Sequence, residues 1–447
     1  MMDRDAAWVA EAAGGRLLAG DRHEPGPERA VIDTRQLRPG DLFVGLRGTR
    51  VDGGEFAPRA LEAGAWGVLV DASRAGSLAT DRPLVAADDP LVALQRLAAA
   101  WRRELGCKLV AITGSTGKTS TKDILAAMLR SQLRTHANHE NLNTEIGLPL
   151  SILEAPPGTE AMVLEMAMRG AGQIAELAAI AEPDVGVIVN VGPVHLELLG
   201  DVEKVAAAKA ELIRDLPAGA ACVVPASEPL LDAHLRDDLD TWTFGPGGQV
   251  ALLSFDAGVA QIEARGERLE LELPFSEAHN LLNALAAMAA ARALGVRPAG
   301  ALEVRFSSLR GEIVELPGGV TLVNDCYNAN PMSMRAALDT LAGSPAERRI
   351  AVLGTMAELG EDSPRFHSQA GAQAAARGID VLVTVGQEAL AYADGFDGES
   401  HAVAGPEEAA ALLDELAQPG DRVLLKGSRS VGLERVLDSL GAPGERG

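Results

Sequence analysis

An α/β fold of three domains is predicted from two features of this chain of 447 residues. From residue 108 onward, apolar strand-like segments alternate with amphipathic helical segments, and the alternation restarts near residue 310. Near-continuous apolar strands separated by helices are typical of parallel sheets whose two faces are both covered. Before residue 83, Gly and Pro break shorter strand-like runs. We therefore expect domains over 1–82, 83–309 and 310–447.

The first domain is expected to be a small α/β unit that leads into a linker helix. Its predicted strands cover 30–33, 41–46 and 67–70, and its predicted helix covers 57–63. A longer helical pattern runs from Pro90 to Glu104, so we place the linker helix within 83–106.

The second and third domains are each expected to hold a mostly parallel sheet. The second has predicted strands over 108–113, 161–165, 184–190 and 220–224, and residues 245–272 indicate β-hairpins without an assigned role. The third has predicted strands over 320–324, 349–353, 380–385 and 422–425, and predicted helices near 332–342, 365–377, 406–417 and 430–440. This alternation is typical of a doubly wound, Rossmann-like unit.

Composition limits the partners of this chain. Its net charge of −23 opposes long-range attraction to nucleic acid or to an anionic membrane. The alanine-rich segment 281–296 is too short for a membrane span and carries Arg292. The three cysteines are scattered and the N-terminus lacks the pattern of a signal peptide. We expect a cytoplasmic monomer with no nucleic-acid partner and no membrane span.

Residues 111–122, AITGSTGKTSTK, form a glycine-rich turn between a predicted strand and a predicted helix over 118–133. Such a turn directs backbone N–H groups at an anion, and the dipole of the following helix adds to the attraction. The loop is shorter than the general Walker pattern, since Ile112 stands where the first glycine is expected. We predict that it binds a nucleoside triphosphate, the alternative being a solvated turn. The predicted nucleotide contacts are Gly114, Ser115, Thr116, Gly117, Lys118, Thr119 and Ser120.

Three further polar residues are candidates for the chemistry. Glu165 ends a predicted strand and His195 follows the next one, which places both at the ligand edge of a parallel sheet. From there Glu165 can reach a magnesium ion held by the hydroxyl of Thr119. Each residue has an alternative role: Glu165 as a helix cap, His195 as a hydrogen-bonded structural residue, and Lys209 as a solvated charge on a helix.

Five polar residues later in the chain are candidate ligand contacts. Asn280 opens the alanine-rich helix and either reads an adenine edge or caps that helix. Arg310, at a domain junction, either reaches phosphates or forms an interdomain salt bridge. Asp325 follows a strand and either binds ribose hydroxyls or stabilises a turn. Lys426 and Arg429 lie before a predicted helix and form a candidate carboxylate or phosphate site.

Taken in order, these motifs resemble those of the Mur ligases, the ATP-dependent amide-forming enzymes of peptidoglycan precursor synthesis. The matching elements are ITGSTGKTS, the segment NLNTEIGLP at 141–149, the strand end at Glu165, and the surroundings of His195 and Lys209. The segments DCYNANPMSMRAAL and LLKGSRS are similar to the member of the family that adds D-alanyl-D-alanine. In the first domain, DTR at 33–35, PGDLFV and DG are similar to the family's uridine-nucleotide domain.

The resemblance implies a UDP-substrate-binding domain, a central ATP-binding P-loop domain and a C-terminal Rossmann-like ligase domain. It implies ATP and Mg²⁺ as cofactors. It also implies two small-molecule substrates, UDP-N-acetylmuramoyl-tripeptide and D-alanyl-D-alanine, joined through an acyl phosphate.

Roles for individual residues are also implied. Lys118, His195 and Lys209 would be catalytic, with Lys209 carbamylated. A lysine with an ordinary pKa of ~10.4 is almost fully protonated at neutral pH, so carbamylation needs a site that favours the neutral amine. Thr119, Glu165, His195 and Lys209 would hold metal.

The remaining implied roles concern ligand binding. Asn280, Arg310 and Asp325 would hold adenine, phosphate and ribose. The residues expected to contact substrate are Thr34, Arg35, Asp52, Asn143, Thr144, Asn328, Lys426 and Arg429. Two positions depart from the family's pattern, because Thr355 stands where aspartate is often found and Ala167 where glycine is more usual.

Four alternatives remain at this point. The first is another ligase of the Mur type. The ligase that glutamylates folates shares a similar fold and loop, although the N-terminal domain and the YNANP run favour a Mur ligase. A P-loop kinase would release a stable phosphorylated product. A nucleotide-binding switch would need neither the Lys209 element nor a cation-bearing third domain.

Overall fold

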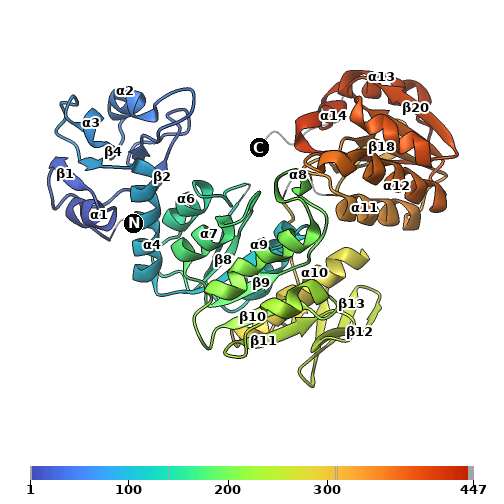
Figure 1. Cartoon of the computed structure of the whole chain (residues 1–447), viewed down its shortest axis with the longest axis horizontal. Helices are drawn as coiled ribbons and strands as arrows, with labels where there is room; N and C mark the ends of the chain where they lie inside the picture. The colour runs from blue at the N-terminus through green and yellow to red at the C-terminus, as the bar shows by residue number, and fades with distance from the viewer. Residues whose placement is uncertain (1–2, 140, 308, 310, 441–447) are drawn as a thin grey trace.

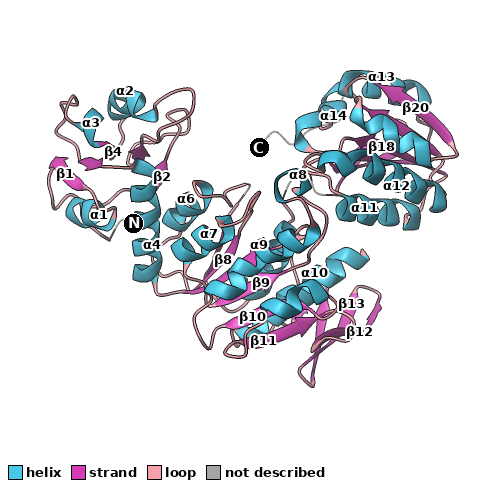
Figure 2. Ribbon diagram, in the orientation of Figure 1, coloured by secondary structure: helices cyan, strands magenta, loops and turns pink. Residues whose placement is uncertain are grey.

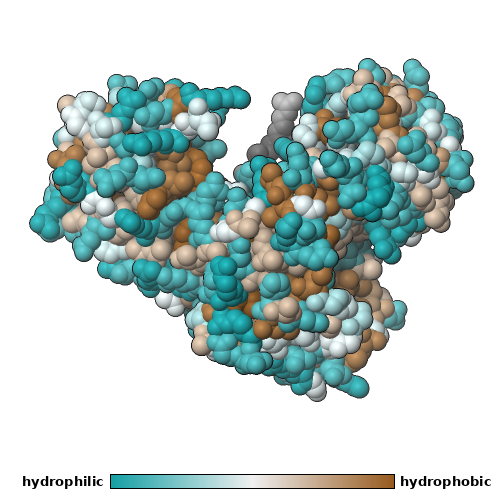
Figure 3. Space-filling model, viewed as in Figure 1, coloured by the Kyte–Doolittle hydropathy of each residue, from teal (hydrophilic) through white to brown (hydrophobic). Residues whose placement is uncertain are grey.

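The computed structural model describes residues 3–139, 141–307, 309 and 311–440. Within them the chain forms three sheets, of five, ten and six strands, each with its own helices (Figure 1). The N-terminal and C-terminal domains lie on either side above the central domain, and Figure 3 shows open space between them. The predicted α/β fold of three domains is confirmed.

The N-terminal sheet has the strand order β1-β5-β4-β3-β2, and only β1 is antiparallel to its neighbour. Its strands are β1 (Arg16–Ala19), β2 (Ala30–Val31), β3 (Leu42–Val44), β4 (Gly67–Asp71) and β5 (Leu84–Ala87). Its helices are α1 (Ala6–Ala12), η1 (Gly53–Phe56), α2 (Ala57–Glu62) and α3 (Ala72–Ala75). The predicted strands and helix are found, whereas β1, β5 and α1 were not predicted.

The predicted boundary after residue 82 is wrong, because β5 still belongs to the N-terminal sheet. All four residues of Leu84–Ala87 are buried, and they pair in parallel with β4. The linker helix α4 (Pro90–Leu105) follows directly, with Asp89 as its N-cap and Gly106 at its end with φ +58°. The first domain therefore ends at the cap of α4.

Helix α4 attaches the N-terminal domain rigidly to the central domain. Leu94, Leu97 and Trp101 are at most 3 % exposed and belong to one hydrophobic core that extends from α1 to the central sheet. The indole Nε1 of Trp101 donates a hydrogen bond of 3.0 Å to the carbonyl of Ala155. The two domains therefore share one packed interior.

The central sheet has the order β15-β14-β13-β12-β11-β10-β9-β6-β8-β7. Its strands are β6 (Lys108–Thr113), β7 (Thr135–Ala137), β8 (Ala161–Glu165), β9 (Val185–Ile188), β10 (Ala221–Pro225), β11 (Asp240–Phe244), β12 (Val250–Asp256), β13 (Val259–Ala264), β14 (Glu267–Glu272) and β15 (Gly300–Ala301). The run from β7 to β12 is parallel, and β12 to β14 form the predicted hairpins.

Helices cover both faces of this sheet, as the apolar strands predicted. In β6, Leu109 and Ala111 enter one core and Val110 and Ile112 the other, since successive side chains of a strand point to opposite faces. One face packs against α6 (Gly147–Glu154), α7 (Gln173–Ala181) and α9 (Val202–Asp215), and the other against α5 (Lys118–Arg130) and α10 (Ala278–Ala293). The short helices are α8 (Leu196–Leu199) and η2 (Pro229–His234).

The C-terminal sheet has the order β16-β17-β21-β18-β19-β20 and is parallel except for its edge strand β16. Its strands are β16 (Glu312–Leu316), β17 (Val320–Asp325), β18 (Arg348–Gly354), β19 (Val381–Val385), β20 (Glu399–Val403) and β21 (Asp421–Lys426). Its helices are α11 (Pro331–Gly343), η3 (Gly360–Asp362), α12 (Ser363–Ala376), η4 (Glu388–Gly395), α13 (Pro406–Leu416), η5 (Arg429–Val431) and α14 (Arg435–Ser439) (Figure 2).

The helix predicted near 430–440 is only partly present. A 3₁₀ turn ends at Val431, Gly432 adopts φ +71°, and α-helix resumes only at Arg435. The left-handed glycine interrupts the helix because a right-handed helix cannot continue through that conformation.

The C-terminal domain has a separate interior. Its buried apolar residues form two cores that contain no residue of the other domains. Phe366 of α12 is partly buried against the core that the first two domains share. The C-terminal domain is therefore the one that can move as a unit. No helix among the described residues is both long and apolar enough to cross a bilayer.

We expect Gly371→Ala to destabilise the protein by roughly 1–3 kcal/mol or more, because a Cβ there would overlap the backbone carbonyl of Tyr392. Gly343→Ala is the matched control, since it also lies in a helix but has open space around its Cβ position. We expect the control to change stability by less than about 1 kcal/mol. Urea unfolding monitored by circular dichroism measures both, and equal midpoints would contradict this packing argument.

Candidate active site

A cavity of about 1410 Å³ lies between the central and C-terminal domains. Its wall includes the whole glycine-rich loop, the start of α10 and the segment that follows β17. Predicted site residues that line it are Gly114, Ser115, Thr116, Gly117, Lys118, Thr119, Ser120, Asn143, Thr144, Glu165, His195, Lys209, Asn280, Asp325, Asn328 and Lys426. Thr34, Arg35, Asp52 and Arg429 do not line it, and Arg310 lies outside the described residues.

The glycine-rich loop connects β6 to α5, and the side chains of Asn190 and Asn283 pack against it. The side-chain oxygen of Asn190 accepts hydrogen bonds from the backbone N–H groups of Ser115 and Thr116, at 3.1 and 3.0 Å. Gly117 adopts φ +76°, and a Cβ there would lie 2.5 Å from the amide oxygen of Asn283. Lys118 Nζ donates to the carbonyl of Gly114 at 3.0 Å.

This geometry suits an anion at the start of α5. Gly117 is the N-cap residue and carries no capping side chain, so the first turn of α5 is left for an anionic ligand. Asn190 was not predicted as a site residue, although its place two residues after the end of β9, at the ligand edge, was a usable signal.

Thr119 and Glu165 meet beneath this loop. Thr119 Oγ1 donates to Glu165 Oε2 at 2.6 Å, and Asn143 Nδ2 donates to Glu165 Oε1 at 2.8 Å. The carboxylate is 3 % exposed, which excludes the alternative of a surface helix cap. The side chain of Asn138, which was not predicted, hydrogen-bonds the backbone N–H and C=O of Glu165 and so fixes the strand end.

A hydroxyl and a carboxylate oxygen in contact form a donor set that suits Mg²⁺, a hard cation that prefers oxygen ligands. No cluster of three or more His, Cys, Asp or Glu side chains that could hold a metal occurs within the described residues. Mg²⁺ commonly binds through one or two protein carboxylates together with phosphate oxygens and water. The residues present therefore fit a magnesium ion that arrives with a nucleotide.

Lys209 is buried in the middle of α9 and is 2 % exposed, which excludes the alternative of a solvated charge. Burial lowers its pKa well below the ordinary value of 10.5, and the positive charge of Lys118 lowers that pKa further. The structure thus favours the neutral amine, the form that carbamylation requires.

His195 lies at the start of α8 with φ +54°, a conformation that residues other than glycine rarely adopt. Its Nδ1 is in close hydrogen-bonding contact with a carboxylate oxygen of Glu358 of the C-terminal domain. Burial lowers the pKa of this imidazole, and the Glu358 carboxylate opposes that shift. Glu358 was not predicted as a site residue.

The C-terminal domain contributes a buried ion pair to the cavity. Lys426 is 1 % exposed, and its Nζ donates to Asp325 Oδ2 at 2.6 Å and to the carbonyl of Asn328 at 3.0 Å. Asn330, which was not predicted, caps α11 and donates to the carbonyl of Ser115 in the glycine-rich loop at 3.3 Å. The loop therefore touches both domains.

Asn280 lies in the first turn of α10 but does not cap that helix. Its Nδ2 donates to Glu277 at 3.3 Å and its oxygen accepts from Asn283 at 3.4 Å. Arg429 is outside the cavity, 58 % exposed, and 3.6 Å from the carboxylate of Glu434.

Comparison with known proteins places these features in one family. Three family descriptions match consecutive parts of the chain: the Mur ligase catalytic domain over 30–102, the Mur ligase middle domain over 112–291 and the Mur ligase glutamate ligase domain over 309–429. UDP-N-acetylmuramoyl-tripeptide–D-alanyl-D-alanine ligase of Synechocystis sp. is 39% identical, with 91% of this chain and 90% of that protein covered. The chain belongs to the Mur ligase family.

Solved structures of this family have the same architecture. MurF from Acinetobacter baumannii superposes with a TM-score of 0.86 at 28% identity, covering 98% of each chain. MurF from Thermotoga maritima in complex with ADP superposes with a TM-score of 0.79 at 32% identity, covering 92% of this chain and 96% of that one.

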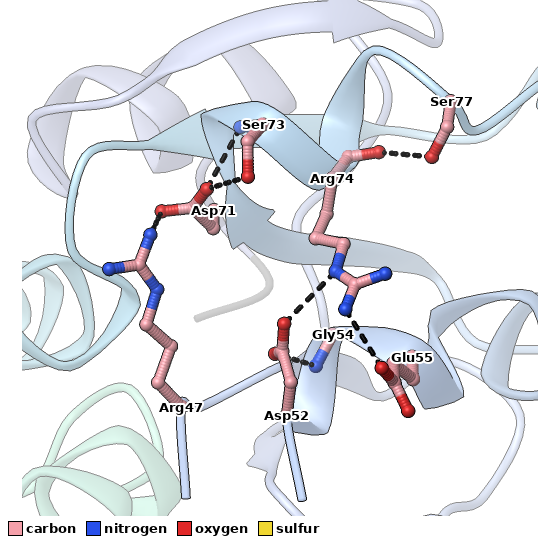
Figure 4. A network of polar contacts seen from close by, with 8 residues as sticks. All are labelled: Arg47, Asp52, Gly54, Glu55, Asp71, Ser73, Arg74 and Ser77. Atoms are coloured by element: carbon pink, nitrogen blue, oxygen red, sulfur yellow. Dashed lines mark hydrogen bonds and ion pairs between the residues drawn. The ribbon is translucent and has the colours of Figure 1, made fainter.

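In this Mur ligase, the predicted contacts of the N-terminal domain lie outside the cavity, and Asp52 and Arg35 belong to two separate polar networks. Asp52 caps η1 and accepts a hydrogen bond of 2.9 Å from Arg74, beside the close ion pair of Arg47 with Asp71 (Figure 4). Arg35 is 82 % exposed and forms an ion pair with Asp33.

The hydrogen bonds from Arg35 lower the pKa of Asp33 to about 2. Thr34 lies between these two residues and is half-buried. None of the N-terminal residues predicted to bind substrate reaches the cavity in this arrangement.

The three cysteines of this Mur ligase are free and buried: Cys107, Cys222 and Cys326. Burial raises the pKa of each thiol, to about 12 for Cys222. The thiolate is therefore disfavoured at all three positions, and Cys326 fills the core of the C-terminal domain.

We expect replacement of Lys209 by Met to stabilise the protein near neutral pH. The unfolded chain binds the Lys209 proton more tightly than the folded protein, so wild-type stability rises with pH between the lowered pKa and 10.5. The free energy of unfolding of Lys209→Met should exceed that of the wild type most at low pH. This difference should decrease as the pH rises through that window, by at most ~1.4 kcal/mol per pH unit. Urea midpoints in CO₂-free buffer from about pH 6 to about pH 10 measure this.

The matched control is Lys204→Met, which removes the same charge from the exposed side of the same helix. If the stability difference between Lys204→Met and the wild type decreased with pH by the same amount, burial of Lys209 could not be the cause of the effect.

Proposed function

We propose that this chain is an ATP-dependent amide ligase that joins D-alanyl-D-alanine to UDP-N-acetylmuramoyl-tripeptide. The products would be the UDP-muramoyl-pentapeptide precursor of peptidoglycan, ADP and phosphate. One observation carries the proposal: the phosphate loop, the Thr119–Glu165 pair and the buried Lys209 all line one cavity, which a cation-bearing third domain completes. The name of the Synechocystis relative, similar over nearly its whole length, supports the choice of substrates.

ATP would bind at the glycine-rich loop. Backbone N–H groups at the start of α5 and the ammonium group of Lys118 would face the phosphates. The Thermotoga maritima relative was solved in complex with ADP, which supports nucleotide binding. Ser115, Thr116 and Ser120 would complete the loop contacts. Asn280 of the central domain would hold adenine and Asp325 of the C-terminal domain the ribose, and both line the cavity.

Mg²⁺ would be held by Thr119 and Glu165, with His195 and a carbamate on Lys209 as further ligands. It would supply positive charge where negative charge gathers on the transferring phosphoryl group. The neutral amine of Lys209 would attack CO₂ and lose a proton, which leaves a carbamate with one negative charge. Burial of Lys209 favours the neutral amine, which is the form that reacts with CO₂.

The tripeptide carboxylate would attack the γ-phosphorus of ATP, the bond to the β-phosphate would break, and ADP would leave, which gives an acyl phosphate. The free amine of D-alanyl-D-alanine would then attack the acyl carbon and lose a proton, and phosphate would leave from a tetrahedral intermediate. Lys118 and the loop N–H groups would lie beside the transferring phosphoryl group. There they would stabilise its negative charge electrostatically and hold it in position. Because the acyl phosphate is sensitive to water, the site must close around it.

Closure would be a movement of the C-terminal domain, since the first two domains share a core. The N-terminal domain would hold the uridine nucleotide through Thr34, Arg35 and Asp52, at a fixed distance from the loop. Asn143, Thr144, Asn328, Lys426 and Arg429 would contact the peptide parts of the substrates.

We propose that the protein acts as a monomer. The three buried free thiols suit a reducing compartment, and we propose the cytoplasm as the location.

Lys118→Ala is expected to reduce kcat/KM by roughly 10²- to 10³-fold or more, because it removes positive charge at the transferring phosphate. Lys108→Ala is the control, since this lysine lies on the same strand-to-helix unit but is 65 % exposed at the other end of β6. Near-normal activity of Lys118→Ala would contradict the central role of this lysine.

Wild-type enzyme freed of CO₂ is expected to regain activity when bicarbonate is added, because the carbamate of Lys209 re-forms. Lys209→Ala should stay inactive with or without bicarbonate, while Lys204→Ala should respond as the wild type does. A fully active Lys209→Ala variant would rule out the carbamate.

Phosphate release separates the ligase from the other classes of protein. We expect release only when UDP-N-acetylmuramoyl-tripeptide and D-alanyl-D-alanine are both present with ATP. A kinase would phosphorylate one substrate and release no phosphate, a nucleotide switch would need neither substrate, and a folate ligase would require a folate and glutamate.

A further inference from the structure

The contact between His195 and Glu358 crosses from the central to the C-terminal domain. His195 precedes α8, whereas Glu358 lies in the loop between β18 and η3. Figure 1 shows α8 against the C-terminal domain, on the side of α11 and α12. The side chains are 22 % and 32 % exposed, so water screens this pair only in part.

The carboxylate of Glu358 is held on both of its oxygens. Oε2 pairs with His195 Nδ1, and Oε1 lies 3.5 Å from Nε of Arg169, in the loop between β8 and α7. The backbone carbonyl of Glu358 accepts a hydrogen bond of 3.3 Å from the N–H of Glu197 in α8. One residue of the C-terminal domain thus contacts two segments of the central domain.

The backbone around Glu358 is fixed from inside its own domain. Met356 N–H donates to Nε2 of His367 at 2.9 Å, and His367 Nδ1 lies 2.7 Å from the carbonyl of Ser363. The imidazole of His367 is fully buried, and burial lowers its pKa. As the neutral tautomer with a proton on Nδ1, it can satisfy both partners.

Two further contacts hold the other parts of the same loop. Ser428 accepts a hydrogen bond from Ala357 N–H at 2.9 Å, and its own N–H donates to the carbonyl of Thr355 at 2.9 Å. The hydroxyl of Tyr392, which is fully buried, donates to the carbonyl of Gly354 at 3.0 Å.

Glu358 itself adopts φ +62°, which is unfavourable for a residue with a side chain. Such strain persists only where surrounding contacts determine the conformation, and it often accompanies a functional role. His195, on the other side of the contact, is also left-handed at φ +54°. Both partners are therefore held in uncommon conformations that bring them together.

A carboxylate on one ring nitrogen fixes the orientation and tautomer of an imidazole. With Nδ1 directed at Glu358, the nitrogen of His195 that remains for a ligand is Nε2, and the residue lines the cavity.

We propose that Glu358 is a positioning residue for His195. It holds the imidazole in the tautomer with a proton on Nδ1, which presents Nε2 as the ligand atom, and it does so only while the C-terminal domain is docked on α8. Docking of that domain is thereby coupled to the tautomer of His195 that can bind a metal through Nε2. The inference rests on the proposed function, in which His195 is a metal ligand.

The tautomer of His195 tests the positioning directly. Protein labelled with ¹⁵N-histidine has 8 histidines, and His195→Gln assigns the signal. We expect a protonated Nδ1 in the wild type and in Glu358→Gln, whose amide oxygen still accepts. Glu358→Ala should shift the signal toward a mixture of tautomers. The proposal is overturned if Glu358→Ala leaves the wild-type signal unchanged.

Glu361→Ala is the matched control, because this exposed glutamate lies three residues further on and forms no ion pair within the described part of the chain. Its His195 signal should equal that of the wild type, and a shift as large as that of Glu358→Ala would overturn the specific role of Glu358. Equal urea midpoints of the variants show that folding is unchanged.

Metal binding separates this inference from the proposed function. With ADP present, Mn²⁺ should broaden the wild-type His195 signal, and Glu358→Ala should need roughly 10- to 100-fold more Mn²⁺ for the same broadening. In Glu358→Ala, the Mg²⁺ concentration that gives half-maximal activity should also rise. The value of kcat at saturating Mg²⁺ should change by a smaller factor than this concentration does. Absence of broadening in the wild type would overturn the metal role of His195, whereas the tautomer measurement decides the role of Glu358.

Discussion

Removal of the Lys209 amine from water is the constraint on which the site depends. A buried ammonium group beside the positive charge of Lys118 is unfavourable, so the protein favours the neutral amine. The same surroundings, a glycine-rich loop that offers N–H groups and a nearby lysine, favour negative charge in the cavity. Anionic groups such as phosphates and a carbamate would therefore be stabilised where a free ammonium is not. The electrostatic surroundings of the cavity therefore favour several anionic groups close together.

The distribution of hydrophobic cores determines which parts can move. Helix α4 joins the N-terminal and central domains in one packed interior, whereas the C-terminal domain has its own. The contacts that cross to the C-terminal domain include polar contacts of Asn330 and Glu358 and an apolar contact of the partly buried Phe366. Polar contacts between preformed surfaces can break and re-form without loss of a core. Movement of that domain is thus compatible with the stability of each part.

Much of the fold followed from the sequence, because buried strands are apolar and the helices between them carry caps and periodic apolar faces. Strands such as 108–113 and 161–165 were placed to the residue. The errors have local causes. β5 lies just before α4 and was assigned to the linker, and Gly432 interrupts a helix whose apolar pattern continues across it. The edge strands β1, β16 and β20 are only partly buried, and each contains exposed residues.

The sequence by itself determined the fold class, the phosphate loop and the polar strand ends, because these depend on residue types at short spacing. Only the tertiary structure decided that Lys209 is buried, that Lys426 is paired with Asp325, and that Glu358 meets His195. Burial and pairing depend on residues more than 100 positions apart, as for Lys426 and Asp325. A lysine on a helix has the same local pattern whether water or protein surrounds it, and its chemistry changes with that difference.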